Sequence, residues 1–223
     1  MATKEASAGV AAAEPDRGGL GRVALLVVGL GIFYAVFARV ALHAFPFSGD
    51  EYSYLLQAQL FARGLLHAPT PAHAELLRVD HVILEPWVCS KYPPGTSALL
   101  ALGVRWGAPW LVTPIEGTVA LCAMASAARR LLSPKEALLA VALLGGAPLF
   151  AFQAASFFSH TAATMWLALA FAAAVAWSLD GGAWRMALAG VAIGCAFLTR
   201  PLDAVLFGAA LLALRSRRAV IVA

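Results

Sequence analysis

The sequence predicts an all-α, polytopic membrane protein: a bundle of about six transmembrane helices and one long outer loop that carries juxtamembrane helices. Two observations predict it. Of the 223 residues, 61% are hydrophobic and only 13% are charged, and the mean hydropathy is +0.80, whereas a soluble domain is nearer half apolar and a quarter charged. The second observation is a series of apolar spans, at about residues 23–42, 110–128, 137–152, 156–179, 184–198 and 202–214.

The first part of the chain divides into a tail, a span and a loop. Residues 1–21 are aperiodic, with Pro15 and Gly18-Gly19, and we expect a disordered cytoplasmic tail. Residues 22–223 form the predicted transmembrane domain. Span 23–42 is long enough to cross about 30 Å of hydrocarbon, which favours an uncleaved signal-anchor. Residues 45–106 form the first outer loop, in which 52–66 has the apolar spacing of an interfacial amphipathic helix. Residues 96–104 are apolar but too short to span, which predicts a juxtamembrane or re-entrant helix.

The distribution of basic residues gives one consistent orientation. With the N-terminus inside, every inner segment carries Lys or Arg, and the short outer turns carry only Arg200. This agrees with the positive-inside rule and predicts a protein of the cell (inner) membrane with a cytoplasmic N-terminus. Because the basic residues follow topology and no Gly-rich phosphate loop follows a strand, nucleic-acid and nucleotide binding find no support.

With that topology, the unusual polar residues fall on the outer, periplasmic or extracellular, side. They are Asp50, Glu51, Lys91, Tyr92, Glu116, His160 and Arg200. Acids at the edge of hydrocarbon indicate a site, but simpler interpretations stay open. Ser48 could be an N-cap with the two acids in the first helical turn. Lys91 and Arg200 could anchor the chain at the interface, and His160 could be a packing residue.

No metal or cofactor is assigned. His67, His73 and His81 share the outer loop with Glu75, Asp80 and Glu85, but their spacing matches no strong metal-binding pattern. A divalent cation stays open as an assistant to the reaction. Cys89, Cys122 and Cys195 lie far apart and form no disulfide framework.

Acids and cations at a membrane edge suit group transfer from a lipid-linked phosphate. Lys and Arg would hold the phosphate and stabilise the charge that builds on it as it leaves. A carboxylate would deprotonate the attacking hydroxyl as a general base. Glycosyl transfer with inversion needs one such base and a stabilised leaving group.

Two motifs carry a family resemblance over roughly residues 23–203. The apolar first span is followed by Gly49-Asp50-Glu51-Tyr52 and an Ala-rich helix, and Lys91-Tyr92-Pro93-Pro94-Gly95 precedes Ala98-Leu99-Leu100. Both resemble the GT-C superfamily of membrane glycosyltransferases, nearest the protein-mannosyltransferase and aminoarabinose-transferase-like group.

The resemblance implies a role for each matched residue. Asp50 would be the catalytic base and Glu51 its neighbour in the acceptor or donor site. Lys91 would contact the donor phosphate, and Arg200, in Thr199-Arg200-Pro201, would contact the phosphate or donor. Tyr92, Glu116 and His160 are further candidates for lining the site because they are polar residues predicted at the outer face. The donor would be a polyprenyl-phosphate sugar, and the acceptor a lipid, glycan or protein.

The resemblance has one departure, because family members usually have more helices and a soluble C-terminal part. This chain stops at Ala223, as residues 219–222 begin what reads as another span, so we expect an N-terminal portion or short relative. Two other functions stay open: a transporter or flippase-like protein that uses Glu116 with Arg200, and a non-catalytic subunit of a larger assembly with a partner subunit.

Overall fold

A computed structural model describes residues 17–222, with side chains between residues 19 and 213 except Leu77. The helices in chain order are α1 (Arg17–Val36), α2 (Gly49–Ala62), α3 (Pro94–Arg105), α4 (Val112–Leu131), α5 (Pro134–Gly145), α6 (Pro148–Ala155), α7 (Ser159–Asp180), α8 (Ala183–Thr199) and α9 (Pro201–Val222). A π-helical turn, Phe37–Ala41, extends α1. Residues 1–16 of the predicted tail lie outside the described residues, whereas 17–21 belong to α1.

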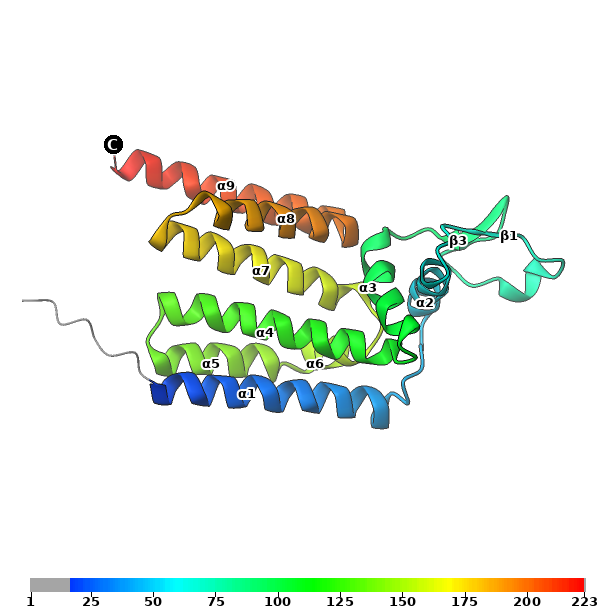
Figure 1. Ribbon diagram of the computed structural model, residues 1–223, viewed down its shortest axis with the longest axis horizontal. Helices are drawn as coiled ribbons and strands as arrows, with labels where there is room; N and C mark the ends of the chain where they lie inside the picture. Colours follow the sequence, from blue (N-terminus) through cyan, green and yellow to red (C-terminus); the bar gives the residue numbers. More distant parts are fainter. Residues whose placement is uncertain (1–16, 223) are drawn as a thin grey trace, which may run out of the picture.

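The long helices run side by side as a bundle, and α2 and α3 cover one end of it (Figure 1). Helix α2 is seen nearly end-on in this view, so it lies across the bundle. The most extensive packing joins α4 to α7 and α7 to α8. Three alanines, Ala120, Ala123 and Ala168, form the α4–α7 contact together with Met165. Small side chains such as alanine allow helices in a membrane to approach closely.

Three helical segments among the described residues are long and apolar enough to cross a membrane: Gly19–Ala41, Pro109–Leu131 and Ser159–Asp180. A fourth is available if α5 and α6 are taken together, although they are bent by 61°. Helix α8 and the apolar part of α9, Pro201–Ala213, are shorter than 18 residues. The mostly helical class is therefore as predicted, and three of the six predicted spans have the full length.

The bend between α5 and α6 falls inside the predicted third span. Gly145 and Gly146 end α5, and Pro148 begins α6. Proline cannot donate a backbone hydrogen bond, so a helix that continued through it would lose one. The buried Tyr34 hydroxyl of α1 donates to the Gly145 carbonyl oxygen at 2.7 Å. A carbonyl freed by the bend thus has a partner inside the bundle, which hydrocarbon surroundings require.

The outer loop contains strands that the sequence pattern did not predict. β1 (Ala68–Pro69), β2 (Val82–Ile83) and β3 (Trp87–Ser90) form an antiparallel sheet in the order β1-β3-β2, and a 3₁₀ turn spans Ala74–Leu77. The sheet extends beyond α2, away from the bundle (Figure 1). Its strand β3 leads directly into Lys91 and the start of α3.

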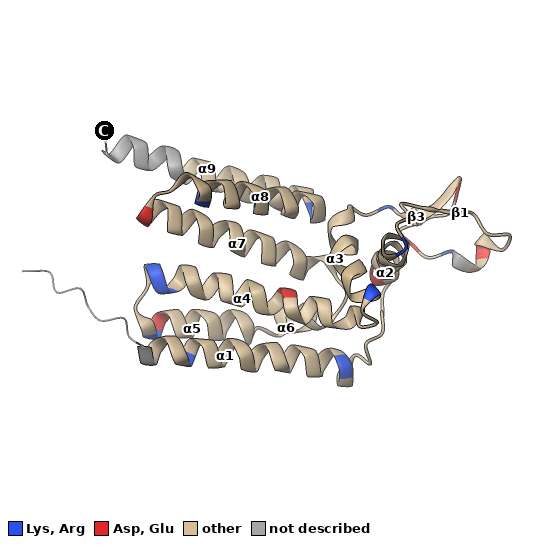
Figure 2. Cartoon of the chain, in the orientation of Figure 1, with Lys and Arg blue, Asp and Glu red and all other residues tan. Residues whose placement is uncertain are grey.

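Charged residues gather toward the two ends of the bundle, and its middle is nearly free of them (Figure 2). The exception is the single acid of α4, Glu116. At the end far from α2 lie Arg22, Arg129, Arg130, Lys135, Asp180 and Arg185. We call this end the basic end, and the opposite one the α2 end.

Candidate functional site

The two acids at the start of α2 have different surroundings. Ser48 caps the helix: its hydroxyl accepts from the Glu51 backbone N–H, and the Glu51 carboxylate accepts from the Ser48 N–H at 3.0 Å. Glu51 Oε2 also accepts from the Phe47 N–H at 2.9 Å, and Oε1 accepts from the Phe157 N–H at 2.9 Å. The Glu51 side chain is 1% exposed. Both of its oxygens are therefore engaged with backbone groups, which confirms the predicted N-cap. Glu51 has a structural role, because it ties α2 to the start of α7.

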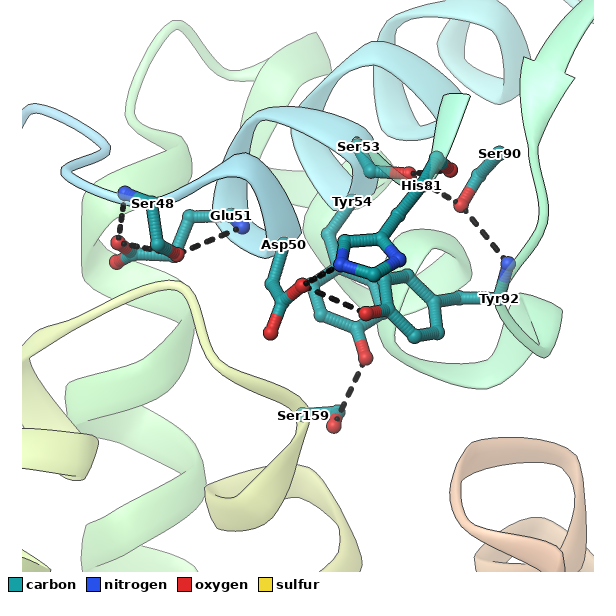
Figure 3. Close-up of polar contacts among 9 residues, drawn as sticks. All are labelled: Ser48, Asp50, Glu51, Ser53, Tyr54, His81, Ser90, Tyr92 and Ser159. Atoms are coloured by element: carbon teal, nitrogen blue, oxygen red, sulfur yellow. Dashed lines mark hydrogen bonds and ion pairs between the residues drawn. The ribbon is translucent and has the colours of Figure 1, made fainter. Parts of the chain in front are cut away.

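Asp50 faces the other way and forms a polar cluster with residues of the outer loop (Figure 3). Its Oδ1 accepts from the Tyr92 hydroxyl at 2.6 Å, and His81 Nε2 lies 3.1 Å from the same oxygen. The Asp50 side chain remains 38% exposed. Within the described residues Oδ2 has no hydrogen-bond partner, so one oxygen of a fixed carboxylate is free to accept a proton from a bound molecule.

The small sheet places His81 and Tyr92 beside Asp50. Val82 of β2 pairs with Ser90 of β3, so His81 and the residues that follow Ser90 lie at the same end of this strand pair. The Lys91 N–H donates to the His81 carbonyl oxygen at 3.1 Å. Ser53, one turn along α2 from Asp50, donates to that same carbonyl oxygen at 2.7 Å. His81 has φ of 75°, a left-handed conformation that is uncommon for a residue other than glycine.

A second set of contacts links this cluster to the helix bundle. The ring of Tyr54 stacks on that of Tyr92 with centroids 4.8 Å apart. The Tyr54 hydroxyl donates to Ser159 Oγ at the start of α7, at 3.0 Å, and Arg200 Nη1 lies 3.4 Å from that oxygen. Arg200 also pairs with Asp203. A continuous path of side chains therefore connects the Asp50 carboxylate to a cation in the turn between α8 and α9.

Burial raises the pKa of both Tyr54 and Tyr92. For Tyr92 the hydrogen bond to Asp50 is the second cause, because ionisation would remove the donated proton and place two negative charges together. The Asp50 charge raises and the Arg200 charge lowers the pKa of each ring. Both tyrosines are therefore neutral donors at physiological pH, and both charges act on the same two rings.

The Lys91-Tyr92-Pro93-Pro94-Gly95 motif meets the Thr199-Arg200-Pro201 turn at Gly95. A Cβ placed on Gly95 would lie 2.5 Å from Thr199 Oγ1 and 2.7 Å from the Leu198 carbonyl oxygen. Only glycine allows the start of α3 to approach the end of α8 this closely. The glycine of Lys91-Tyr92-Pro93-Pro94-Gly95 thus sets the distance between Tyr92 and the turn that carries Arg200.

The side chains of the other predicted site residues make no hydrogen bond or ion pair with the Asp50 cluster among the described residues, although Lys91 and His160 directly adjoin its members Tyr92 and Ser159. Lys91 is exposed and makes no ion pair within the described part of the chain. Glu116 is 2% exposed, and neither of its carboxyl oxygens has a hydrogen-bond partner there. The Glu116–Arg200 pair that the transporter hypothesis needs is not formed, since Arg200 pairs with Asp203. The His160 ring lies 6.0 Å from Phe158, and its Nδ1 is buried without a partner among those residues.

Sequence reasoning missed four members of the cluster as site residues: Tyr54, His81, Ser159 and Asp203. Tyr54 follows Asp50 by four residues, and in a helix this spacing places both side chains on one face. Ser159 and Asp203 stand beside predicted residues, but nothing in their spacing joins them to Asp50. His81 was considered only as a metal ligand. Between residues 17 and 222, no group of three or more His, Cys, Asp or Glu side chains could hold a metal ion.

Comparison with known proteins adds no further guide: no family model, curated protein or solved structure matches the chain.

Proposed function

We propose that this protein transfers a sugar from a polyprenyl-phosphate-linked donor to an acceptor hydroxyl at the outer face of the cell membrane, with inversion and with Asp50 as the general base. In this proposal α8, α9 and the bent α5–α6 pair complete six spans. The N-terminus and the basic end are cytoplasmic, and the α2 end is outside. The observation that carries the proposal is the Asp50 carboxylate, which is oriented by Tyr92, leaves one oxygen available, and is connected to Arg200.

Asp50 has the contacts that a general base needs. Two neighbours, Tyr92 and His81, contact Oδ1, which fixes the plane of the carboxylate and leaves Oδ2 for the acceptor. Oδ2 would take the proton of the acceptor hydroxyl while that oxygen attacks the anomeric carbon. The bond from the anomeric carbon to the phosphate oxygen breaks at the same time, and the polyprenyl phosphate leaves with the electron pair.

Arg200 is the cation best placed to receive that leaving phosphate. It lies at the α2 end of α9, where a lipid phosphate at the membrane surface would sit, and its guanidinium can form paired hydrogen bonds with phosphate oxygens. Part of its charge is balanced by Asp203. Lys91, exposed on the same loop, is the second candidate phosphate contact. Glu51 takes no chemical role in the proposal because its oxygens are already engaged.

The test is transfer from a radiolabelled polyprenyl-phosphate sugar by membranes that contain the chain. Asp50→Asn should slow transfer by about 10²- to 10⁴-fold, which is the typical contribution of a general base to the rate. Asp80→Asn is the matched control: it removes the same charge from an exposed acid of the same loop and should leave transfer unchanged. Equal transfer by Asp50→Asn and wild type would remove Asp50 as the base, and equal losses in both variants would show a general effect of loop charge.

A further inference from the structure

A groove lies between α1 and α4 toward the basic end, away from the Asp50 cluster. Its volume is about 590 Å³. Most of its lining is apolar, with Val23, Val27 and Val28 from α1 and Cys122 and Ala125 from α4. Two arginines in the last turn of α4, Arg129 and Arg130, line its end. An apolar groove with a cationic side chain at one end can bind an amphiphile that has an anionic headgroup.

The groove exists because α1 and α4 are close at only one end of their contact. A Cβ on Gly31 would lie 2.5 Å from Thr118 Oγ1, so the backbone of α1 packs directly against the Thr118 side chain there. Toward the basic end the space opens, and a Cβ on Gly21 would meet nothing within 4 Å. Thr118 therefore marks the closed end of the groove and Arg129 the open one.

The length of the groove corresponds to one leaflet of a bilayer. Helix α4 rises about 16 Å from Thr118 to Arg129, at about 1.5 Å per residue. Half of the roughly 30 Å hydrocarbon core is about 15 Å. An acyl chain lying in the groove would end near the bilayer midplane at Thr118, and its headgroup would be level with Arg129.

The charge at the open end is unbalanced. Within the part of the chain that the structure describes, Arg129 makes no ion pair. Arg130 lines both this groove and the neighbouring one between α4, α7 and α8, of about 390 Å³, and it pairs with Asp180 at 2.7 Å. Arg185, in the neighbouring groove alone, lies 3.2 Å from the same carboxylate. An anion at the first groove would therefore meet the Arg129 guanidinium, which has no carboxylate partner among the described residues, beside Arg130, which is already paired with Asp180.

We propose that the groove between α1 and α4 binds one anionic phospholipid, with an acyl chain along the apolar lining and the phosphate at Arg129. Basic pockets between transmembrane helices recognise anionic headgroups by such a combination of charge and apolar burial. The proposal does not depend on glycosyl transfer, because the site lies at the opposite end of the bundle from Asp50 (Figure 2).

The test is native mass spectrometry of the detergent-purified chain titrated with phosphatidylglycerol or phosphatidylcholine. Arg129→Gln should weaken phosphatidylglycerol binding about fivefold, the effect of one basic residue at a membrane surface. Val28→Trp should weaken it by filling the groove. The controls are Arg105→Gln, an exposed arginine on α3, and Val205→Trp, since Val205 on α9 is 55% exposed, as is Val28. Both controls should bind as wild type.

Three results would overturn the proposal. Equal binding of phosphatidylcholine and phosphatidylglycerol would show that headgroup charge is not recognised. Equal losses in Arg129→Gln and Arg105→Gln would show general attraction to a basic protein. Unchanged binding in Val28→Trp, together with displacement of the lipid by inorganic phosphate, would show a site for free anions at Arg129 that does not use the groove.

Discussion

Replacing Gly95 with alanine should separate α3 from the end of α8. The added Cβ would lie 2.5 Å from Thr199 Oγ1 and 2.7 Å from the Leu198 carbonyl oxygen, where ordinary contacts begin near 3.4 Å. The helices must therefore move apart by about 0.7 to 0.9 Å. One of the two obstacles is backbone, so rotation of a side chain cannot relieve the clash.

The expected cost follows from the behaviour of overpacked cores. Inserting one methyl group into a close contact typically costs about 1–3 kcal/mol. Gly194→Ala is the matched control on α8, since a Cβ there would meet nothing within 4 Å, and replacing an interior helical glycine with alanine typically gains up to about 1 kcal/mol. The free energies of unfolding of the two variants should therefore differ by about 1 to 4 kcal/mol.

The assay is reversible unfolding in mixed detergent micelles, followed by tryptophan fluorescence. Thr199→Ala in the Gly95→Ala background should recover part of the loss, because it removes Oγ1 and leaves the Leu198 carbonyl in place. Such contacting residues typically show coupling of at least about 0.5 kcal/mol. Gly95→Ala as stable as Gly194→Ala would refute the close approach, as would full additivity of the two changes.

Three further predictions follow from single contacts. Tyr34→Phe should lower the free energy of unfolding by about 1–2 kcal/mol in the same assay, because it leaves the Gly145 carbonyl without a donor inside the bundle; unchanged stability would contradict that contact. His81→Asn should keep the fold, since asparagine tolerates the left-handed backbone found there, and should slow sugar transfer without weakening donor binding; equal transfer would exclude His81 from orienting Asp50. Tyr92 should remain protonated above the ordinary tyrosine pKa of about 10, so its favourable contribution to stability is present below that pH and is lost as the pH rises through the higher folded value. Asp50→Asn should lower the pKa of Tyr92 in an ultraviolet tyrosinate titration, with Tyr92→Phe identifying the signal; an unchanged value would contradict the hydrogen bond.

The sequence predicted a helix well where an apolar pattern is long or where a residue pattern for a helix N-terminus is present. Ser48 with Glu51 three residues later is a capping pattern, and α2 begins at Gly49. Predicted helix 96–104 corresponds to α3, which starts at Pro94. The bend at Gly145-Gly146-Ala147-Pro148 was readable from its glycines and proline, although hydropathy alone joined its two sides into one span.

The cluster around Asp50 was only half predictable because its other half depends on pairing across the outer loop. Strands β1 and β2 have two residues each and β3 has four, too few to show an alternating pattern. The register of β2 with β3 brings His81 to Tyr92, and no local spacing reveals that register. The pair Asp50-Glu51 also does not by itself show which acid takes part in the helix cap. Only the position of Glu51 as the third helical residue indicates it.

Donor binding and transfer measured on the same preparation of Asp50→Asn test the central claim most directly. If Asp50 is the general base, the variant should bind the polyprenyl-phosphate sugar about as tightly as wild type, because Arg200 and the groups around it are unchanged. Its single-turnover transfer should be slower by about 100-fold or more. Transfer at the wild-type rate, or a loss of transfer fully explained by weaker donor binding, would contradict the assignment.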